Sequence, residues 1–319
     1  MKGQRQNMGE RNFTSCDQKS NVHVMIWKPD KALYPKPLAI LQIAHGMVEY
    51  IERYSDFAQF LTKSGILVVG NDHLGHGHTA SCEEDLGYFK HDNPENALVH
   101  DMHHLTNIIK TKYPNVPYFL LGHSMGSFMT RKYISIYGDE LDGVILSGTG
   151  NQRKPLISLA LFLTDLIGLF KGERYRSKFL ANTMMSGYNK KINEPKTPSD
   201  WISRDEKIVD KYVHDKYCTF LFTINAYKGM FRTIKYISKQ HNIDKIPADL
   251  PMLMASGTMD PVGGYAKDVK RLYQKYSKRI NNISLKLYEG DRHEILNELD
   301  RETVYADILN WIQEQIKKN

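Results

Sequence analysis

The chain has 319 residues, a length that favours one large α/β domain or a domain that carries a sizeable insertion. Hydrophobic residues make up 41% of the chain and charged residues 25%, which argues against a disordered protein. The net charge of +7 comes from lysines and arginines scattered along the chain, so we expect a solubilising surface charge and no nucleic-acid partner.

The chain begins with the pattern of a β-hairpin, followed by alternating strands and helices. A segment around Phe13, a polar turn at Asp17–Ser20 and the run NVHVMIWKP predict the hairpin. Longer segments of helical spacing, at 52–63 and 96–112, separate short apolar runs at 38–44, 66–70, 118–121, 143–146, 251–255 and 283–287. Continuous apolar strands separated by helices predict an α/β fold, a mainly parallel sheet with helices on both faces.

The alternation stops between residues 151 and 240. This segment contains the apolar run PLISLALFLTDLIGLF, the basic stretch KGERYRSK, a loop with two prolines, and a helix whose Ser203 and Glu206 have capping-box spacing. We therefore predict a core made of residues 1–150 and 241–319, with a helical cap inserted at 151–240. A last helix, with Val304, Ile308, Ile312 and Ile316 four residues apart, closes the core.

A strand-to-helix turn carries the first candidate for catalysis. Gly122-His123-Ser124-Met125-Gly126 matches the G-x-S-x-G nucleophile elbow, with an apolar strand before it and a helical pattern after it. Gly122 and Gly126 leave room for a tight turn, which would hold Ser124 strained with its hydroxyl exposed above the sheet. We expect Ser124 to be the nucleophile, although a serine in an ordinary loop bend would give the same five letters.

A serine nucleophile needs a base that is oriented by an acid, in the chain order Ser, Asp or Glu, His. Asp260 follows an apolar strand in PMLMASGTMDPVGG, and His293 follows the final strand in ISLKLYEGDRHEILNE. Both are expected at the carboxyl edge of the sheet, where Asp260 would orient His293. Asp291 is a rival acid, which we interpret as a loop residue that shapes the turn.

Hydrolysis of an acyl group also needs donors for the oxyanion, each worth about 3–4 kcal/mol. His45, Gly46 and Met47 follow the first long apolar strand and form a glycine-containing loop. The Met47 N–H could join that of Met125, at the start of the helix after Ser124. We give His45 and Gly46 a supporting role in this loop.

These motifs together resemble the monoacylglycerol lipase and lysophospholipase branch of the serine α/β-hydrolases, which is serine aminopeptidase S33-like. The matching stretches, in the expected order, are HGMVE at 45–49, NDHLGHG at 71–77, GHSMGS at 122–127, GTMDPV at 257–262 and GDRHE at 290–294. SDWISRD at 199–205 is similar to a stretch in the cap of bacterial members. Tyr50 departs from the pattern, because animal monoacylglycerol lipases have histidine there.

The resemblance implies an α/β-hydrolase fold and a serine carboxylic-ester hydrolase that acts on single-chain lipids through an acyl-enzyme. By the same resemblance Ser124 is the nucleophile, Asp260 orients, and His293 is first base and then acid. Met47 and Met125 supply the oxyanion donors. The reaction implies neither a metal nor an organic cofactor, and its substrate is a lipid or small-molecule ester.

The apolar run that starts at Pro155 has two interpretations. It could be a cap helix buried against the core, or part of it could be exposed beside the pocket and contact a membrane while guiding an acyl chain inward. The neighbouring stretch KGERYRSK would suit an anionic surface.

Other functions compete with the lipase interpretation. His73, His76 and His78, with His100, His103 and His104, invite a metal-hydrolase hypothesis, although their spacing lacks the ligand order of a recognisable zinc motif. Capped serine hydrolases also include general carboxylesterases, thioesterases and aminopeptidases that remove N-terminal proline. A non-catalytic binding protein is disfavoured because all three triad positions are filled.

Cysteine usage predicts the compartment. Cys16, Cys82 and Cys218 are odd in number and far apart, which does not suit a disulfide framework. The opening residues lack the apolar core of a secretory signal, and no apolar run reaches the length of a membrane span. We expect a cytoplasmic protein.

Overall fold

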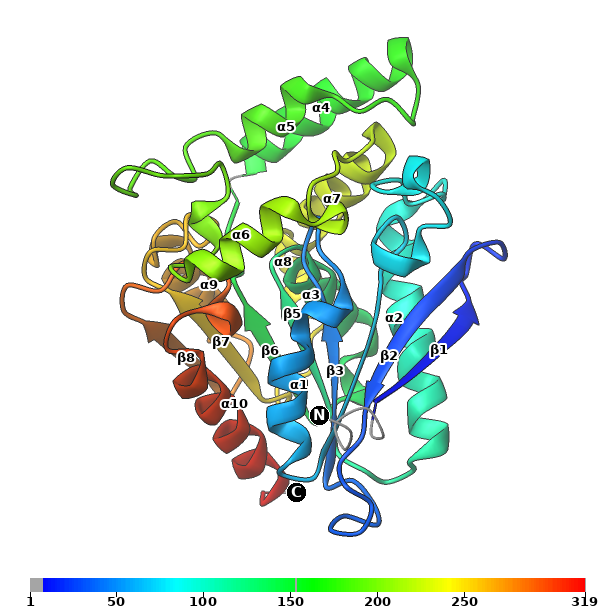
Figure 1. Cartoon of the computed structure of the whole chain (residues 1–319), viewed down its shortest axis with the longest axis vertical. Helices are drawn as coiled ribbons and strands as arrows, with labels where there is room; N and C mark the ends of the chain where they lie inside the picture. Colours follow the sequence, from blue (N-terminus) through cyan, green and yellow to red (C-terminus); the bar gives the residue numbers. More distant parts are fainter. Residues whose placement is uncertain (1–7, 153, 319) are drawn as a thin grey trace.

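A computed structural model describes residues 8–152 and 154–318, which are built around one eight-stranded sheet (Figure 1). The strands lie in the order β1-β2-β4-β3-β5-β6-β7-β8. β1 pairs with β2 and β2 with β4 in antiparallel fashion, and the remaining neighbours are parallel. Their bounds are β1 Met8–Thr14, β2 Asn21–Trp27, β3 Ala39–Ala44, β4 Ile66–Asn71, β5 Tyr118–His123, β6 Gly143–Ser147, β7 Met252–Gly257 and β8 Ile283–Tyr288.

Every strand predicted from an apolar run is present within one or two residues of its predicted bounds. The opening hairpin is confirmed as well, with Thr14 opposite Asn21 across a turn in which the Asp17 carboxylate accepts hydrogen bonds from the backbone of Lys19 and Ser20. The fold is therefore the α/β arrangement that the sequence predicts.

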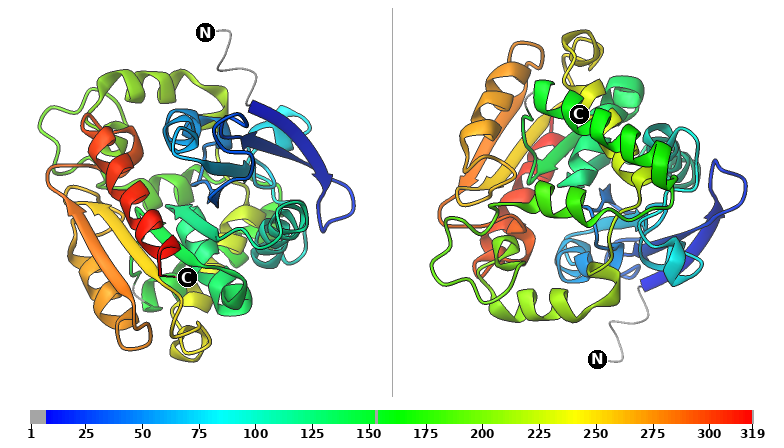
Figure 2. Two further views of the ribbon diagram at one scale, coloured as in Figure 1. Left: turned by 90° about the horizontal axis from the view of Figure 1, so that it is seen from below. Right: turned by 90° about the horizontal axis from the view of Figure 1, so that it is seen from above.

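Helices cover both faces of the sheet, as the views from below and above show (Figure 2). α1 (Ser55–Thr62) and α10 (Arg301–Ile316) pack on one face, where Leu41, Phe119 and Ile145 point. α2 (Pro94–Lys112), α3 (Met125–Tyr137) and α9 (Lys267–Tyr276) pack on the other face. Successive strand residues alternate between the two cores because side chains in a strand alternate between faces.

The chain between β6 and β7 is helical. It forms α4 (Lys154–Lys171), α5 (Lys178–Met185), α6 (Glu206–His214), α7 (Ile224–Ile237) and α8 (Gln240–Ile243), and α4 and α5 lie at the top of Figure 1. α7 buries Tyr227, Met230 and Ile234 in the same core as α2 and α3. The division into a core and a cap at residues 151 and 240 stays a prediction.

One helix start differs from its prediction. α6 begins at Glu206, and its N-cap is Asp205, whose carboxylate accepts a hydrogen bond from Lys207 N. The Ser203 hydroxyl accepts a hydrogen bond from Asp205 N over 2.9 Å, before the helix begins, and donates to the Asn297 carbonyl oxygen over 2.8 Å. The predicted cap is therefore wrong by two residues, because the helix starts later than the capping-box spacing indicates.

The apolar run from Pro155 forms most of α4 and has two different faces. Ile157, Leu161, Thr164 and Gly168 are buried, at intervals of three and four residues. The opposite face exposes Leu156, Leu159, Phe162, Leu166, Leu169 and Phe170. Among the described residues, no helix is long and apolar enough to cross a bilayer.

Candidate active site

Ser124 lies between the end of β5 and the start of α3, on the turn that the sequence predicts. Its backbone has φ 51° and ψ −120°, a strained conformation for a residue with a side chain. The Ser124 N–H donates to the Ser147 carbonyl oxygen over 2.9 Å, which fixes the turn to β6. A Cβ on Gly126 would collide with the Ala44 carbonyl oxygen, so the close approach of the turn to β3 requires glycine there.

Asp260 and His293 meet although they lie on different loops, after β7 and after β8. Nδ1 of His293 lies 2.9 Å from Oδ1 of Asp260, and the two side chains are 3% and 0% exposed. Within the described chain, His293 Nε2 is buried without a hydrogen-bond partner. This arrangement leaves Nε2 available to accept a proton.

The electrostatics of this pair favour a basic imidazole. Burial lowers the pKa of His293, but the Asp260 carboxylate, with smaller contributions from Glu294 and Glu49, raises it, so the pKa ends above its usual value of 6.5. The rival acid Asp291 does not contact the ring through its carboxylate, which binds Arg204 instead.

The loop after β3 lies against the elbow. A Cβ built on Gly46 would be 3.1 Å from the Ser124 Cβ, so the loop backbone passes directly beside the serine. His45 is buried, and its Nε2 accepts a hydrogen bond from His73 N over 2.9 Å. Its Nδ1 therefore carries the proton and donates to the Gly46 carbonyl oxygen over 2.8 Å. His45 thus joins the backbone of Gly46 to that of His73, and its supporting role in catalysis stays a prediction.

Five of the nine predicted site residues line one pocket of about 270 Å³, whereas Asp260, His45, Gly122 and Gly126 do not. Ser124, Met125, Met47 and His293 line it from the core, together with Gly46. As first residue of α3, Met125 has an N–H without an acceptor in the preceding turn of the helix. The insertion contributes further lining residues, mostly apolar or aromatic, among them Leu156, Ile157, Ala160, Met184, Met185, Tyr188 and Trp201.

A buried charge network under the pocket was missed at the sequence level. Arg53 forms ion pairs with Glu49 over 2.8 Å and with Glu294 over 2.7 Å. Glu49 also accepts hydrogen bonds from Gly46 N and the Tyr54 hydroxyl. The network thus joins the loop after β3 to the residue next to His293. Both glutamates lie inside quoted motifs, but Arg53 carried no signal.

Burial and the charge of Arg53 have opposite effects on the pKa values of the two glutamates. Burial raises the pKa of Glu294, but the bidentate ion pair with Arg53 lowers it, and the net shift of the pKa is downward. For Glu49, burial dominates and the pKa is raised, with Arg53 opposing the shift. Arg53 is therefore shared between two carboxylates of unequal acidity.

Of the histidines behind the metal hypothesis, His73 and His76 lie beside each other, with ring centres 6.2 Å apart, while those on α2 lie elsewhere. Burial lowers the pKa of His73 to about 4 and that of His76 to about 3, which favours neutral rings. On α2, His103 contacts Glu140 and stacks on Tyr137, and the His104 ring contacts Phe13. Within the described ranges, the one group of three side chains close enough to share a metal ion is Asp291, Glu298 and Asp300.

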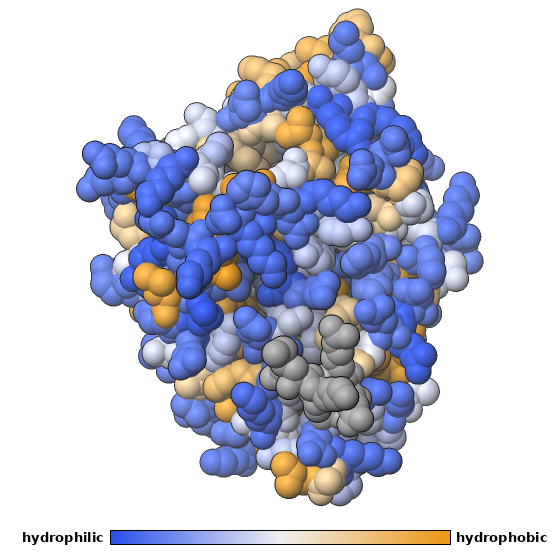
Figure 3. Space-filling model, in the orientation of Figure 1, coloured by the Kyte–Doolittle hydropathy of each residue, from blue (hydrophilic) through white to orange (hydrophobic). Residues whose placement is uncertain are grey.

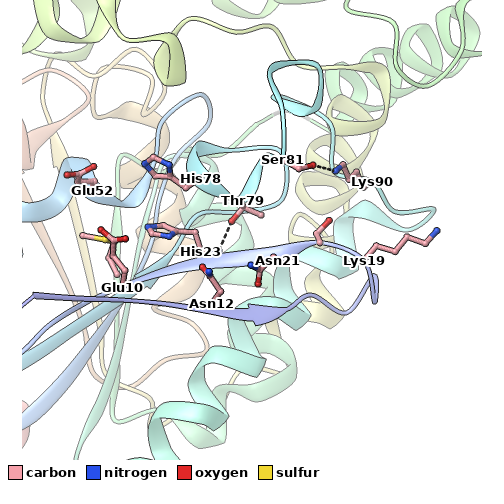
Figure 4. A pocket seen from close by; sticks show the side chains of 12 residues that line it. Glu10, Asn12, Lys19, Asn21, His23, Glu52, His78, Thr79, Ser81 and Lys90 are labelled. Atoms are coloured by element: carbon pink, nitrogen blue, oxygen red, sulfur yellow. Dashed lines mark hydrogen bonds between the residues drawn. The ribbon is translucent and has the colours of Figure 1, made fainter.

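A second pocket, of about 500 Å³, lies beside the opening hairpin (Figure 4). Its walls include Glu10, Lys19, His23, Glu52 and His78, and the His23 N–H donates to the Thr79 hydroxyl over 2.9 Å. None of the predicted site residues lines it. Its polar walls contrast with the apolar walls of the pocket at Ser124.

Several known proteins are similar to this chain over most of its length. A monoglyceride lipase homolog of Monkeypox virus is 28% identical over 93% of this chain and 95% of its own length. A monoacylglycerol lipase of Mycolicibacterium smegmatis is 26% identical over 90% of this chain and 91% of its own. The crystal structure of a thermostable carboxyl esterase from Bacillus coagulans in complex with glycerol is 31% identical, with a TM-score of 0.89 over 97% of this chain and 99% of that one.

The relatives are lipases and esterases, and the protein is an enzyme of the carboxylic ester hydrolase type. The family model described as serine aminopeptidase, S33, matches residues 35–300, which includes the elbow, the loop after β3 and the loops of Asp260 and His293. The chain belongs to this serine aminopeptidase S33 family of α/β-hydrolases.

Proposed function

We propose that the protein hydrolyses monoacylglycerols, with Ser124 as nucleophile, His293 as base and then acid, and Asp260 as the residue that orients His293. The observation that carries this proposal is the convergence of Ser124, Met47, Met125 and His293 on one apolar pocket. An apolar pocket beside a nucleophile suits an acyl chain next to its ester carbonyl.

In the proposed reaction, Ser124 Oγ attacks the ester carbonyl carbon while its proton moves to His293 Nε2. The oxyanion accepts hydrogen bonds from the Met47 and Met125 N–H groups. Collapse of the intermediate breaks the bond to glycerol, and His293 returns the proton to the departing oxygen. A water molecule, deprotonated by His293, then releases the fatty acid and restores Ser124.

The charge of the pocket favours an uncharged head group. Among the described residues that line it there is no lysine or arginine, while Glu49 and Glu294 are both present. A lysophospholipid would bring a phosphate into a pocket whose lining offers no lysine or arginine to pair with it. Glycerol has only hydroxyl groups, and the related Bacillus coagulans esterase was crystallised with glycerol.

The pairing of Glu49 and Glu294 with Arg53 argues against a proline-type aminopeptidase. Such an enzyme needs an acidic subsite for the free amine of its substrate, and Glu49 and Glu294 stand at a suitable place. Both are already bound to Arg53, which leaves little negative charge for an amine. We therefore keep this activity as an outcome of the substrate test.

The test is a screen of the purified protein against substrates that differ in one feature. The set is 1-decanoylglycerol, 1-decanoyl lysophosphatidylcholine, p-nitrophenyl decanoate, decanoyl coenzyme A and proline p-nitroanilide. We expect kcat/KM for the monoacylglycerol to exceed that for the lysophospholipid by at least about tenfold, since one unpaired charge costs more than 1.4 kcal/mol. Higher activity on the lysophospholipid or on the proline amide would overturn the proposed substrate.

The exposed face of α4 supports a peripheral contact with lipid surfaces. Leu169, Phe170 and Phe162 are 79%, 75% and 62% exposed, and Phe179 on α5 is 60% exposed. Figure 3 shows hydrophobic surface gathered at the top of the molecule, over these helices. Lys154, Lys171 and Lys178 are exposed near the same helix ends and would attract anionic head groups.

The exposed face of α4 lies next to the pocket and could guide a substrate into it. Leu156 is 61% exposed and also lines the pocket, so one side of α4 joins the outside to the site. A monoacylglycerol could pass from a lipid surface along α4 to Ser124. In this proposal the insertion, residues 151–240, acts as a cap over the core.

The basic stretch after α4 contributes less to this surface than its composition predicts. Arg176 donates to the carbonyl oxygens of Glu84 and Leu86, and Arg174 stacks over Tyr88 at 4.1 Å from the ring centre. These arginines hold the insertion to the core. The proposed attraction to anionic lipid therefore rests on the three lysines.

We also propose that the protein acts in the cytoplasm. Cys16, Cys82 and Cys218 are all free thiols, which suits a reducing compartment.

A further inference from the structure

A segment of the insertion lies along the loop that carries His293. We call residues 199–205 the anchor segment and residues 289–300, between β8 and α10, the histidine loop. The backbone N–H of His293 donates to the Trp201 carbonyl oxygen over 3.3 Å, and that of Glu294 donates to Ile202 over 2.7 Å. The backbone on both sides of the imidazole is therefore held by the insertion as well as by the core.

Side chains extend this contact in both directions. Arg292 donates to the carbonyl oxygens of Asp200 and Ser203, over 2.6 and 2.9 Å. The Ser203 hydroxyl donates back to Asn297. The Trp201 ring centre lies 4.9 Å from that of His293, so the anchor segment also touches the imidazole itself.

Arg204 forms the most highly charged part of the contact. Its Nε lies 2.9 Å from Glu298, and its Nη2 lies 2.7 Å from Asp300 and also binds Asp291. The Arg204 backbone N–H donates to the same Glu298 carboxylate over 3.0 Å. One arginine of the insertion thus binds three carboxylates of the histidine loop.

These carboxylates need a cation nearby. Asp291 and Glu298 are fully buried, and the three acids are close enough together to share a metal ion. Burial and the Glu298 charge raise the pKa of Asp291 to about 7, while Arg204 lowers it. Without the guanidinium, repulsion between the acids would push the loop apart or force a proton onto Asp291.

Asp291 lies two residues before His293, and its own backbone is part of the site. Its carbonyl oxygen accepts a hydrogen bond over 2.9 Å from Met259, the residue before Asp260. A shift of Asp291 would therefore move the loops of both members of the His293–Asp260 pair. Small displacements of this kind are costly, because about 1 Å of misplacement can reduce a rate 100-fold.

We propose that Arg204 is a positioning residue, which clamps the histidine loop to the anchor segment and thereby keeps the His293–Asp260 pair aligned toward Ser124. This inference rests on the proposed function, since the alignment matters for ester hydrolysis by Ser124. Arg204 does not line the pocket, so it acts through the loop and not on the substrate.

The test compares Arg204→Gln with two matched variants, using p-nitrophenyl butyrate as substrate. Arg176→Gln removes an arginine that also ties the insertion to the core, but through the carbonyl oxygens of Glu84 and Leu86. Arg204→Lys keeps the charge but loses the fork that binds three acids. A second readout is the downfield proton NMR signal of the hydrogen-bonded His293 Nδ1–H.

We expect Arg204→Gln to lower kcat by about 10- to 100-fold with KM within about twofold, and to broaden or shift the Nδ1–H signal. Arg204→Lys should recover part of kcat, and Arg176→Gln should keep both kcat and the signal. If Arg204→Gln changes kcat no more than Arg176→Gln does, or lowers kcat with an unchanged Nδ1–H signal, the positioning role is wrong.

The double variant Arg204→Gln/Asp291→Asn covers the case in which the single variant does not fold. It removes the buried charge that the single variant would leave unpaired, but it still lacks the clamp. We expect a folded protein with the same loss of kcat, and wild-type kcat in this variant would overturn the proposal. A wild-type protein without ester turnover would contradict the proposed function instead, while the Nδ1–H signal would still test the alignment by Arg204.

Discussion

Nδ1 of His293 lies 2.9 Å from Oδ1 of Asp260, and the two residues are 33 positions apart in the chain. The parallel strands β7 and β8 end side by side, so their following loops bring both residues to one edge of the sheet. Because the aspartate raises the imidazole pKa, the pair sets the pH range in which His293 can act as a base.

The first prediction concerns pH. His293 must be neutral to accept the Ser124 proton, and its pKa lies above 6.5. We therefore expect kcat/KM to fall about tenfold per pH unit below this pKa, and to reach a plateau above it. A profile measured with p-nitrophenyl butyrate from pH 5 to 9 checks this, and an apparent pKa well below 6.5 would contradict it.

Asp260→Asn tests the partner in the same pair. The amide cannot hold the imidazole in the required tautomer, so we expect kcat to fall by about 10⁴-fold. Asp291→Asn is the matched control, since it neutralises the rival acid two residues from His293. If Asp291→Asn caused the larger loss in kcat, the assignment of Asp260 would be wrong.

Arg53→Met is predicted to destabilise the protein strongly. It would leave the buried Glu49 and Glu294 without their cation, and breaking a buried ion pair costs about 3–5 kcal/mol. Urea unfolding measures the loss. The control is Lys196→Met, which removes an exposed ion pair with Glu206 and should cost less than about 1 kcal/mol. Equal stability of the two variants would refute the central role of Arg53.

Membrane contact through α4 can be tested by flotation with vesicles that contain anionic lipid. Phe162→Glu/Leu169→Glu places two charges on the exposed face without touching the core, and we expect it to float several-fold less than the native protein. Leu33→Glu changes a leucine that is 73% exposed in the loop before β3, and it should float normally. Equal flotation of all three proteins would end this proposal.

Periodicity and motif spacing anticipated most of the fold. Apolar runs such as Ile66–Gly70 are interpreted as buried strands once helical segments flank them. Ser124, Asp260 and His293 each follow such a run. Their convergence could be expected because parallel strands deliver their carboxyl ends to one edge. The loop after the first long strand and the helix start after Ser124 suggested Met47 and Met125 as oxyanion donors, the resemblance implied the same two residues, and their role stays a prediction.

Side-chain partners distant in sequence were beyond this reasoning. Ser203 was expected to cap a helix, but Asp205 caps it, and the Ser203 hydroxyl donates to Asn297, 94 residues away. Arg53 and Arg204 have no local pattern that distinguishes them from surface arginines, and each forms an ion pair with an acid of the histidine loop. Which face of α4 is buried was likewise undetermined, because the run is apolar nearly all round.

Covalent labelling of Ser124 tests the proposed mechanism most directly. The protein is treated with a fluorophosphonate, with and without excess 1-decanoylglycerol, and the modified peptide is located by mass spectrometry. We predict one stoichiometric adduct on Ser124, slowed by the monoacylglycerol, and complete loss of ester turnover. Full turnover after treatment, or an adduct on another residue together with undiminished activity of Ser124→Ala, would contradict it.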